Sequence, residues 1–260
     1  MAVTFKGLGN EGRLGNQMFQ YAFVRGVAAN RGFDWMIPGP NADRLDNYGL
    51  FDAFELTNCD LNRNTGEPFY KTVEYRDMHF NEEIYDRCED NTNFSGNFQT
   101  ERYFETIAAS IREDFTFKKA YLEPCQDFID SLGGRDECIF LHVRRGNPNL
   151  TGRRGEKWSY QMVQEYHPLC KAEYYVRALQ EFPEDKTVIV VSDVIDWCKK
   201  QPYLQGDRFQ FSDSSYEVFG DGASVPYVDL CLMSLCGGAI IANSSLSWWG
   251  AWLQGDVGKV

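Results

Sequence analysis

Two adjacent arginines, Arg144 and Arg145, follow an apolar run at residues 138–143. A run of this kind is typical of a strand that is buried on both faces. Because side chains alternate along a strand, His142 and Arg144 are expected on one face and Arg145 on the other. A guanidinium binds phosphate through a bidentate fork and stays charged at any working pH. The pair therefore predicts a phosphate site at the carboxyl end of this strand, with a surface ion pair as the alternative.

Polar residues also follow two further apolar runs, at 187–191 and 239–242. They are Ser192, Asp193, Asn243, Ser244 and Ser245. A carboxylate such as Asp193 can accept hydrogen bonds from a nucleobase or a ribose, or it can cap a helix that begins near Ile195. Hydroxyl and N–H groups at the start of a helix favour an anion. Ligands of a doubly wound sheet bind at the carboxyl ends of its strands, so the three polar strand ends predict a nucleotide diphosphate site.

The elements that would position these residues alternate along the second half of the chain. Helical patterns separate or follow the apolar runs, at 170–182, 195–200, 225–236 and 247–253. Strands that alternate with helices predict an α/β fold with a doubly wound parallel sheet.

Periodicity in the first half is clear only near its two ends. It predicts strands at 3–6 and 35–37 and helices at 16–29, 110–117 and 120–132, whereas 41–100 shows weak periodicity. Gly133 and Gly134 end the last of these helices just before the strong strand. We therefore expect two lobes, residues 1–135 and 136–260.

Gly7, Gly9 and Gly12 have the spacing of the dinucleotide-binding fingerprint and lie between a predicted strand and a predicted helix. That fingerprint also requires an acidic residue at the end of the second strand, and Asp34 precedes the predicted strand instead. An NAD-type dehydrogenase is thus the alternative from another class of enzyme. Asn16 lies near the cap of the same helix, where backbone N–H groups favour an anionic or polar ligand.

The composition disfavours several classes of partner. The 260 residues include 38 acidic and 26 basic side chains, a formal net charge of -12, which disfavours nucleic acid and anionic lipid. No signal peptide is visible, and no apolar stretch is long enough for a membrane span. We expect a soluble, cytoplasmic protein without an integral membrane segment. The eight cysteines form no Cys-x-x-Cys pair and the three histidines lie in no zinc-finger spacing, so no metal or other cofactor is expected.

Five segments, taken together, resemble the α-1,2-fucosyltransferase family. They are GRLGNQMFQYA at 12–22, FSGNFQTERYF at 94–104, HVRRG at 142–146, SD at 192–193 and NSSLSWWGAWL at 243–253. The resemblance implies a two-lobed GT-B fold, with an N-terminal lobe on the acceptor side and a Rossmann-like C-terminal lobe that binds GDP-fucose. It further implies transfer of L-fucose, with inversion, to a hydroxyl of an acceptor glycan, expected to be the 2-OH of galactose.

The same resemblance implies roles for individual residues. His142 and Asp193 would contact the guanine nucleotide. Ser244 or Ser245 would contact the phosphates, and Asn16 would face the donor from the first lobe. The predicted donor-binding set is completed by Arg144, Ser192 and Asn243.

Departure of GDP leaves negative charge on the β-phosphate, which must be stabilised. The sequence contains no Asp-x-Asp motif to hold a metal, so Arg144, with Arg145 behind it, is expected to supply the positive charge. These two residues and Asn16 form the predicted catalytic set, and the enzyme is expected to be metal-independent.

The sequence does not identify the group that takes the proton of the acceptor hydroxyl. Glu11, Glu156 and His167 are candidates, but each is better explained as a surface or structural residue than as the base. Asn147 stands where the family usually has Asp. This departure leaves a GDP-sugar-binding protein without catalysis as a second alternative.

Overall fold

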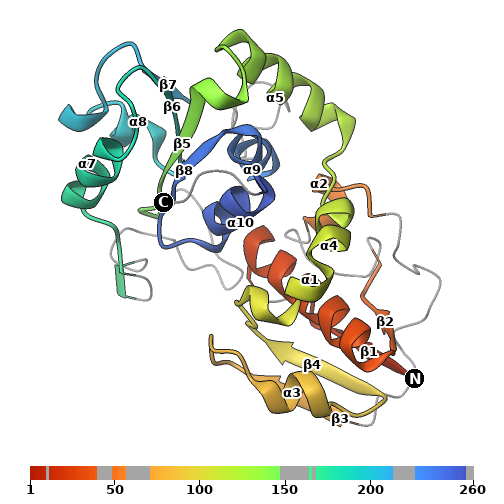
Figure 1. Cartoon of the computed structure of the whole chain (residues 1–260). Coiled ribbons are helices and arrows are strands. Elements are labelled where there is room, and N and C mark those ends of the chain that lie inside the picture. Colours follow the sequence, from red (N-terminus) through yellow and green to blue (C-terminus); the bar gives the residue numbers. More distant parts are fainter. Residues whose placement is uncertain are drawn as a thin grey trace. The chain divides into compact units, whose positions relative to one another are not determined.

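The computed structural model describes residues 1–9, 12–39, 49–56, 71–146, 164–165, 168–212 and 226–255. The chain divides into two compact units, Met1–Lys118 and Lys119–Val260. Each unit contains its own four-stranded sheet, in which all neighbouring strands are parallel (Figure 1). Within the described ranges, no helix is both long and apolar enough to cross a membrane.

The sheet of the first unit has the strand order β2-β1-β4-β3. Its strands are β1 (Ala2–Thr4), β2 (Asp34–Met36), β3 (Lys71–Tyr75) and β4 (Thr92–Gly96). The helices are α1 (Leu14–Arg31), α2 (Leu50–Ala53), α3 (Glu82–Arg87) and α4 (Ala108–Asp114), with 3-10 turns η1 (Glu101–Tyr103) and η2 (Glu105–Ile107). Aromatic side chains fill the core. The ring of Phe23 in α1 stacks on Phe98 at 3.7 Å between centroids and meets Phe94 and Tyr103 edge-on.

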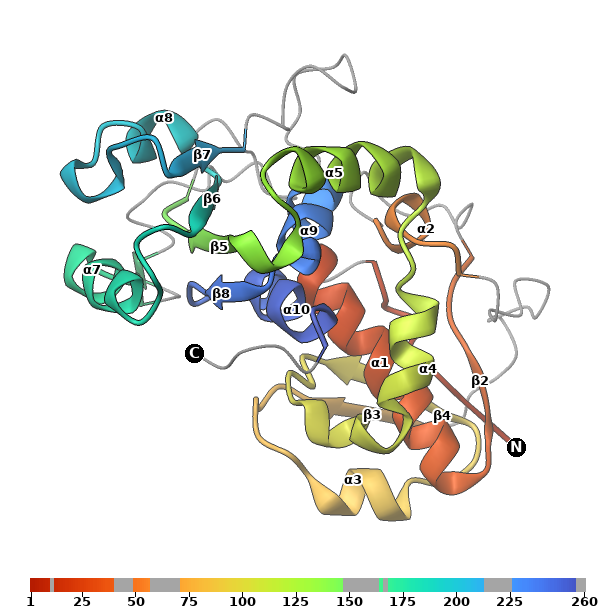
Figure 2. The ribbon, with the colours of Figure 1, turned by 45° about the horizontal axis from the view of Figure 1, so that its top comes forward.

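The sheet of the second unit has the order β7-β6-β5-β8. Its strands are β5 (Cys138–Val143), β6 (Thr187–Ser192), β7 (Phe209–Phe211) and β8 (Gly238–Ile240). Its helices are α5 (Lys119–Ser131), α7 (Ala172–Gln180), α8 (Ile195–Cys198), α9 (Pro226–Leu235) and α10 (Ser245–Leu253), with 3-10 turns η3 (Arg135–Glu137) and η4 (Pro202–Leu204). Helices α7 and α8 cover one face and α5, α9 and α10 the other, so the predicted doubly wound sheet is confirmed (Figure 2).

The central strand β5 is buried along its whole length. Ile139, Leu141 and Val143 pack into one cluster with buried side chains of α7 and α8. Phe140 and His142 alternate with them and therefore point to the opposite face. If this alternation continues past the end of β5, it determines to which face of the sheet the next side chains point.

The structure differs from the sequence-based prediction at the lobe boundary and at three strands. The division falls after Lys118 and not after residue 135, because α5 packs against α9: the rings of Tyr121 and Tyr227 lie 5.6 Å apart. Strands β3, β4 and β7 were not predicted. Asp34 begins β2, which is the wrong end of the strand for the ribose contact of a dinucleotide-binding fold.

Candidate active site

The carboxylate of Asp193 is the centre of the polar contacts at the ends of β5 and β6. Val143 pairs with Ser192 in the register of these two strands, so the next residues of each, Arg144 and Asp193, lie side by side. Arg144 Nη1 donates to Asp193 Oδ2 at 2.7 Å. The two side chains are only 19% and 9% exposed, so water screens the ion pair weakly.

The same carboxylate also accepts two backbone hydrogen bonds. The N–H of Arg145 donates to Oδ1 at 3.0 Å and the N–H of Gly146 donates to Oδ2 at 2.8 Å. Gly146 has a φ of 92°, a left-handed conformation that glycine adopts without steric cost. Asp193 therefore fixes the backbone of the loop after β5 as well as the guanidinium of Arg144.

Arg145 is held by a different kind of contact. Its Cζ atom lies 3.8 Å from the centroid of the Trp197 ring, a cation–π geometry. Trp197 belongs to α8, on the face of the sheet to which Val143 points. The predicted alternation of His142, Arg144 and Arg145 thus agrees with the contacts that the structure gives them.

His142 is a buried, neutral imidazole beside the ion pair. Burial lowers its pKa from 6.5 to about 4; the negative charge of Asp193 opposes this shift, and the positive charge of Arg144 adds to it. The side chain is 4% exposed, and its Nδ1 atom has no hydrogen-bond partner among the described residues. Buried polar atoms in proteins nearly always have a partner. The neutral ring therefore keeps one nitrogen whose hydrogen bond no described residue makes.

Ser247 fixes the start of α10 at the end of β8. Its buried hydroxyl accepts a hydrogen bond from the N–H of Ala242 at 3.3 Å and lies 3.2 Å from the carbonyl oxygen of Ser244. Ser244 is the N-cap residue, and its side chain makes no capping hydrogen bond. The amino end of α10, with its N–H groups, therefore lies at the same edge of the sheet as Arg144.

Two predicted residues of this edge use their side chains in local contacts. The hydroxyl of Ser192 accepts a hydrogen bond from the N–H of Val194 at 3.0 Å. Asn243 Nδ2 donates to the carbonyl of Pro168 at 3.2 Å and so connects the end of β8 to the segment before α7. These contacts shape the rim of the site.

Asn16 lies in the first turn of α1, in the first unit, where a hydrogen bond holds its side chain and Gly12 leaves room for it. Gln99 Nε2 donates to Asn16 Oδ1 at 2.8 Å. A Cβ atom on Gly12, whose φ is 76°, would lie 2.4 Å from Asn16 Nδ2, so a larger residue there displaces Asn16. Gln99 follows Phe98, which is fully buried with a φ of 51°, a strained conformation for a bulky residue.

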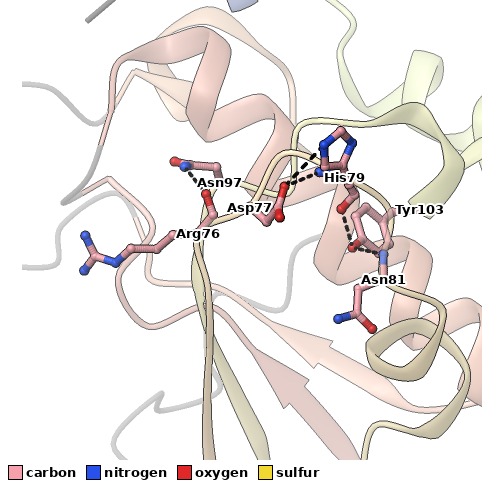
Figure 3. Close-up of polar contacts among 6 residues, drawn as sticks. All are labelled: Arg76, Asp77, His79, Asn81, Asn97 and Tyr103. Carbon is pink, nitrogen blue, oxygen red and sulfur yellow. Dashed lines mark hydrogen bonds and ion pairs between the residues drawn. The ribbon is translucent and has the colours of Figure 1, made fainter.

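Further polar contacts fix the loops that follow β3 and β4 in the first unit (Figure 3). Asn97 Nδ2 donates to the carbonyl of Arg76 at 3.2 Å, while the Arg76 side chain points away from the group (Figure 3). The hydroxyl of the buried Tyr103 accepts a hydrogen bond from the N–H of Asn81 at 2.8 Å. Burial raises the pKa of Tyr103 to about 12, so it remains a neutral phenol.

The structure brings most of the predicted site residues together. Those of the second unit all lie at one edge of its sheet and are His142, Arg144, Arg145, Ser192, Asp193, Asn243, Ser244 and Ser245. Asn16 lies at the carboxyl edge of the sheet of the first unit. Asn147 and the candidate bases Glu11, Glu156 and His167 fall outside the described residues.

One alternative for Asp193 is wrong, and two contacts were not predicted. Asp193 does not cap α8: the residue at the cap is Val194, and the carboxylate binds the loop after β5. Sequence reasoning also missed the contacts of Trp197 and Gln99. Gln99 lay inside a segment that carried the family resemblance, whereas nothing in the sequence marked Trp197.

Comparisons with known proteins identify the family. Residues 7–259 match the model of glycosyl transferase family 11. The chain is 29% identical to an α-1,2-colitosyltransferase of Escherichia coli, covering 94% of this chain and 85% of that protein. It is 25% identical to human galactoside α-(1,2)-fucosyltransferase 1, covering 94% of this chain and 64% of that protein.

Solved structures agree with the fold. The fucosyltransferase NodZ from Bradyrhizobium has a TM-score of 0.59 at 15% identity, covering 96% of this chain and 91% of NodZ. POFUT1, solved in complex with GDP, has a TM-score of 0.53 at 12% identity, covering 99% and 95%. The fold is therefore of the GT-B-like α/β class. The chain belongs to glycosyl transferase family 11 and is a glycosyltransferase similar to the α-1,2-fucosyltransferases.

The contacts of Asp193 predict a local loss of stability on its removal. Asp193→Ala leaves the Arg144 guanidinium and two backbone N–H groups without their acceptor, which should lower the free energy of unfolding by about 1–3 kcal/mol. Urea denaturation measures this change. Asp196→Ala, which removes an exposed carboxylate of α8, is the matched control and should change stability by less than about 0.5 kcal/mol. Equal stability of the two variants would contradict the anchoring role.

The buried His142 predicts a pH-dependent stability. Its pKa is about 4 in the folded protein against 6.5 in the unfolded chain, so the unfolded chain binds more protons between these values. Stability that is present above pH 6.5 should be lost as the pH falls toward 4, and His142→Phe should flatten this part of the profile. His79→Gln, which removes an imidazole that is 88% exposed, should leave the profile unchanged. Urea denaturation at several pH values measures the free energy of unfolding as a function of pH. If its slope is unaltered in His142→Phe, His142 is not the origin of the pH dependence.

Proposed function

We propose that this protein transfers L-fucose from GDP-fucose to a hydroxyl of an acceptor glycan. The observation that carries the proposal is the Arg144–Asp193 pair at the carboxyl edge of a doubly wound sheet, where ligands of such sheets bind. Membership of glycosyl transferase family 11 supports the reaction class. The NodZ and POFUT1 structures, which were solved with GDP or GDP-fucose, support the donor.

In this proposal the second unit binds the donor. Arg144, held by Asp193, contacts the β-phosphate, and the N–H groups at the start of α10 with Ser244 and Ser245 complete an anion site. His142, with its neutral ring nitrogen, contacts the nucleoside. Asp193 then acts on the nucleotide through Arg144, so its loss should affect the phosphate contact as well as local stability.

The chemical step replaces the bond between fucose C1 and the β-phosphate oxygen by a bond between C1 and the acceptor oxygen. The leaving GDP takes the electron pair of the broken bond, and the proton of the acceptor hydroxyl passes to the solvent. Arg144 and Arg145 stabilise the charge that develops on the phosphate, which makes a metal unnecessary. Attack from the side opposite to GDP inverts the configuration at C1.

The acceptor and the donor sugar follow from the similarity to individual relatives. The similarity to galactoside α-(1,2)-fucosyltransferase 1 favours the 2-OH of galactose as the acceptor. The colitosyltransferase relative makes colitose the second candidate donor sugar. An assay of GDP release with GDP-fucose and GDP-colitose, across a panel of galactosides, tests both points when the product linkage is determined by NMR.

The same assay separates the competing functions. A GDP-sugar-binding protein without catalysis binds GDP in calorimetry and releases none from GDP-fucose with any acceptor. A dehydrogenase binds NADH and not GDP. Transfer to galactose with an α-1,2 linkage supports the full proposal. Transfer with another linkage supports GDP-fucose as the donor but contradicts the 2-OH of galactose as the acceptor.

Loss of the phosphate contact should lower the rate strongly. Arg144→Ala is expected to reduce kcat by about 10²–10³, because one preorganised charge donor is lost. Arg177→Ala removes an exposed arginine from α7 of the same unit and should retain full activity. Steady-state kinetics on folded protein decide the matter, and near-normal turnover in Arg144→Ala would exclude its role.

Activity should not require a divalent metal. Prior treatment with EDTA, followed by assay in EDTA, should leave kcat within about two-fold of the untreated value if the arginines supply the charge that a metal otherwise supplies. Restoration of a lost activity by added Mn²⁺ or Mg²⁺ would show instead that a metal takes part.

A further inference from the structure

The contact between Arg145 and Trp197 joins the site to the core of the second unit. The guanidinium carbon lies 3.8 Å from the centroid of the indole ring. Trp197 is half-buried and packs against the cluster formed by β5, β6, α7 and α8, which includes Leu141 and Val143. The ring therefore has core side chains behind it and the cation in front of it.

Two hydrogen bonds hold the backbone of Trp197. Its N–H donates to the carbonyl of Val194 at 2.9 Å, and its own carbonyl accepts from Gln201 Nε2 at 2.9 Å. Ile195 and Cys198, on either side of it in α8, are buried. A ring held at its backbone and against the core has little freedom to move with the arginine.

Arg145 is thus constrained at two points by one segment of chain. Asp193 holds its backbone N–H, and Trp197, four residues further on, holds its guanidinium. Stacking uses the flat face of a guanidinium, whereas its N–H donors lie in the plane and point from its edge. A guanidinium that lies over an aromatic ring can therefore also donate to an anion through N–H groups that point away from the ring.

We propose that Trp197 is a positioning residue that orients the Arg145 guanidinium toward the diphosphate of the donor. The inference rests on the proposed function, because it assigns Arg145 an anion to bind. An apolar residue of similar size at position 197 would fill the same space in the core. It would not attract the cation, since the attraction comes from the negative face of an aromatic ring.

Three variants separate orientation of Arg145 from packing of the core. Trp197→Leu keeps an apolar side chain and removes the ring, Trp197→Phe keeps a ring face, and Arg145→Met removes the cation. A cation–π contact contributes enough that Trp197→Leu should lower kcat/KM for GDP-fucose by roughly two- to thirty-fold, while Trp197→Phe retains most of it. Melting temperatures measured on the same proteins report packing by itself.

The decisive measurement is the double-mutant cycle. If Trp197 acts through Arg145, Trp197→Leu causes no further loss of kcat/KM in the Arg145→Met background. If the losses are independent, or if Trp197→Phe is as impaired as Trp197→Leu, Trp197 serves the core alone and the inference is wrong.

The affinity for GDP distinguishes failure of the inference from failure of the proposed function. It is measured by calorimetry on the four proteins of the cycle: the wild type, Trp197→Leu, Arg145→Met and the variant with both substitutions. A wild-type protein that binds GDP but transfers no fucose contradicts the function, and the cycle in GDP affinity still tests Trp197. If the wild-type protein transfers fucose and the losses in the cycle are additive, the inference about Trp197 is wrong and the proposed function stands. A wild-type protein that neither binds GDP nor releases it from GDP-fucose overturns both.

Discussion

The Asp193 carboxylate accepts three hydrogen bonds from the residues after β5, and the geometry of the candidate active site depends on them. The register of β5 and β6 sets the positions of the partners, because it pairs Val143 with Ser192 and so brings Arg144 beside Asp193. A register shifted by one residue would turn Asp193 to the other face of the sheet. The buried apolar side chains of both strands, which fix the register, therefore also determine where the positive charge of Arg144 lies.

The two arginines of the site are held in different ways, and this difference has chemical consequences. Asp193 compensates part of the charge of Arg144 and fixes its direction, whereas the indole of Trp197 fixes Arg145 without adding a negative charge. His142 stays neutral beside Arg144 and Asp193 because burial disfavours its charged form. In a chain with a formal net charge of -12, this local arrangement concentrates positive charge where an anionic ligand can use it.

The sequence predicts the centre of the second unit well, because burial on both faces leaves a continuous apolar run. Residues 138–143 form β5 with the predicted bounds, and the predicted alternation places Arg144 and Arg145 in different surroundings. The sequence did not predict β3, because that strand is short and mostly exposed and so leaves no apolar run. The contacts of Asp193 and Gln99 could not be predicted from the sequence, for another reason. Arg144 and Asp193 are separated by 49 positions in the sequence, and Asn16 and Gln99 by 83. Only the folded structure brings such distant residues together.

The kind of contact found at each sheet edge bears on which unit binds which substrate. In the second unit the anchoring contacts involve full charges, Arg144 with Asp193 and Arg145 over Trp197, as recognition of a diphosphate requires. In the first unit the contacts are mixed: neutral amides hold Asn16 through Gln99, while Arg76 and Glu74 form an ion pair at the end of β3. Neutral donors and acceptors suit the hydroxyls of a sugar, which carry direction but no charge. The two charged contacts beside β5 are therefore in keeping with the proposal that the second unit binds the donor.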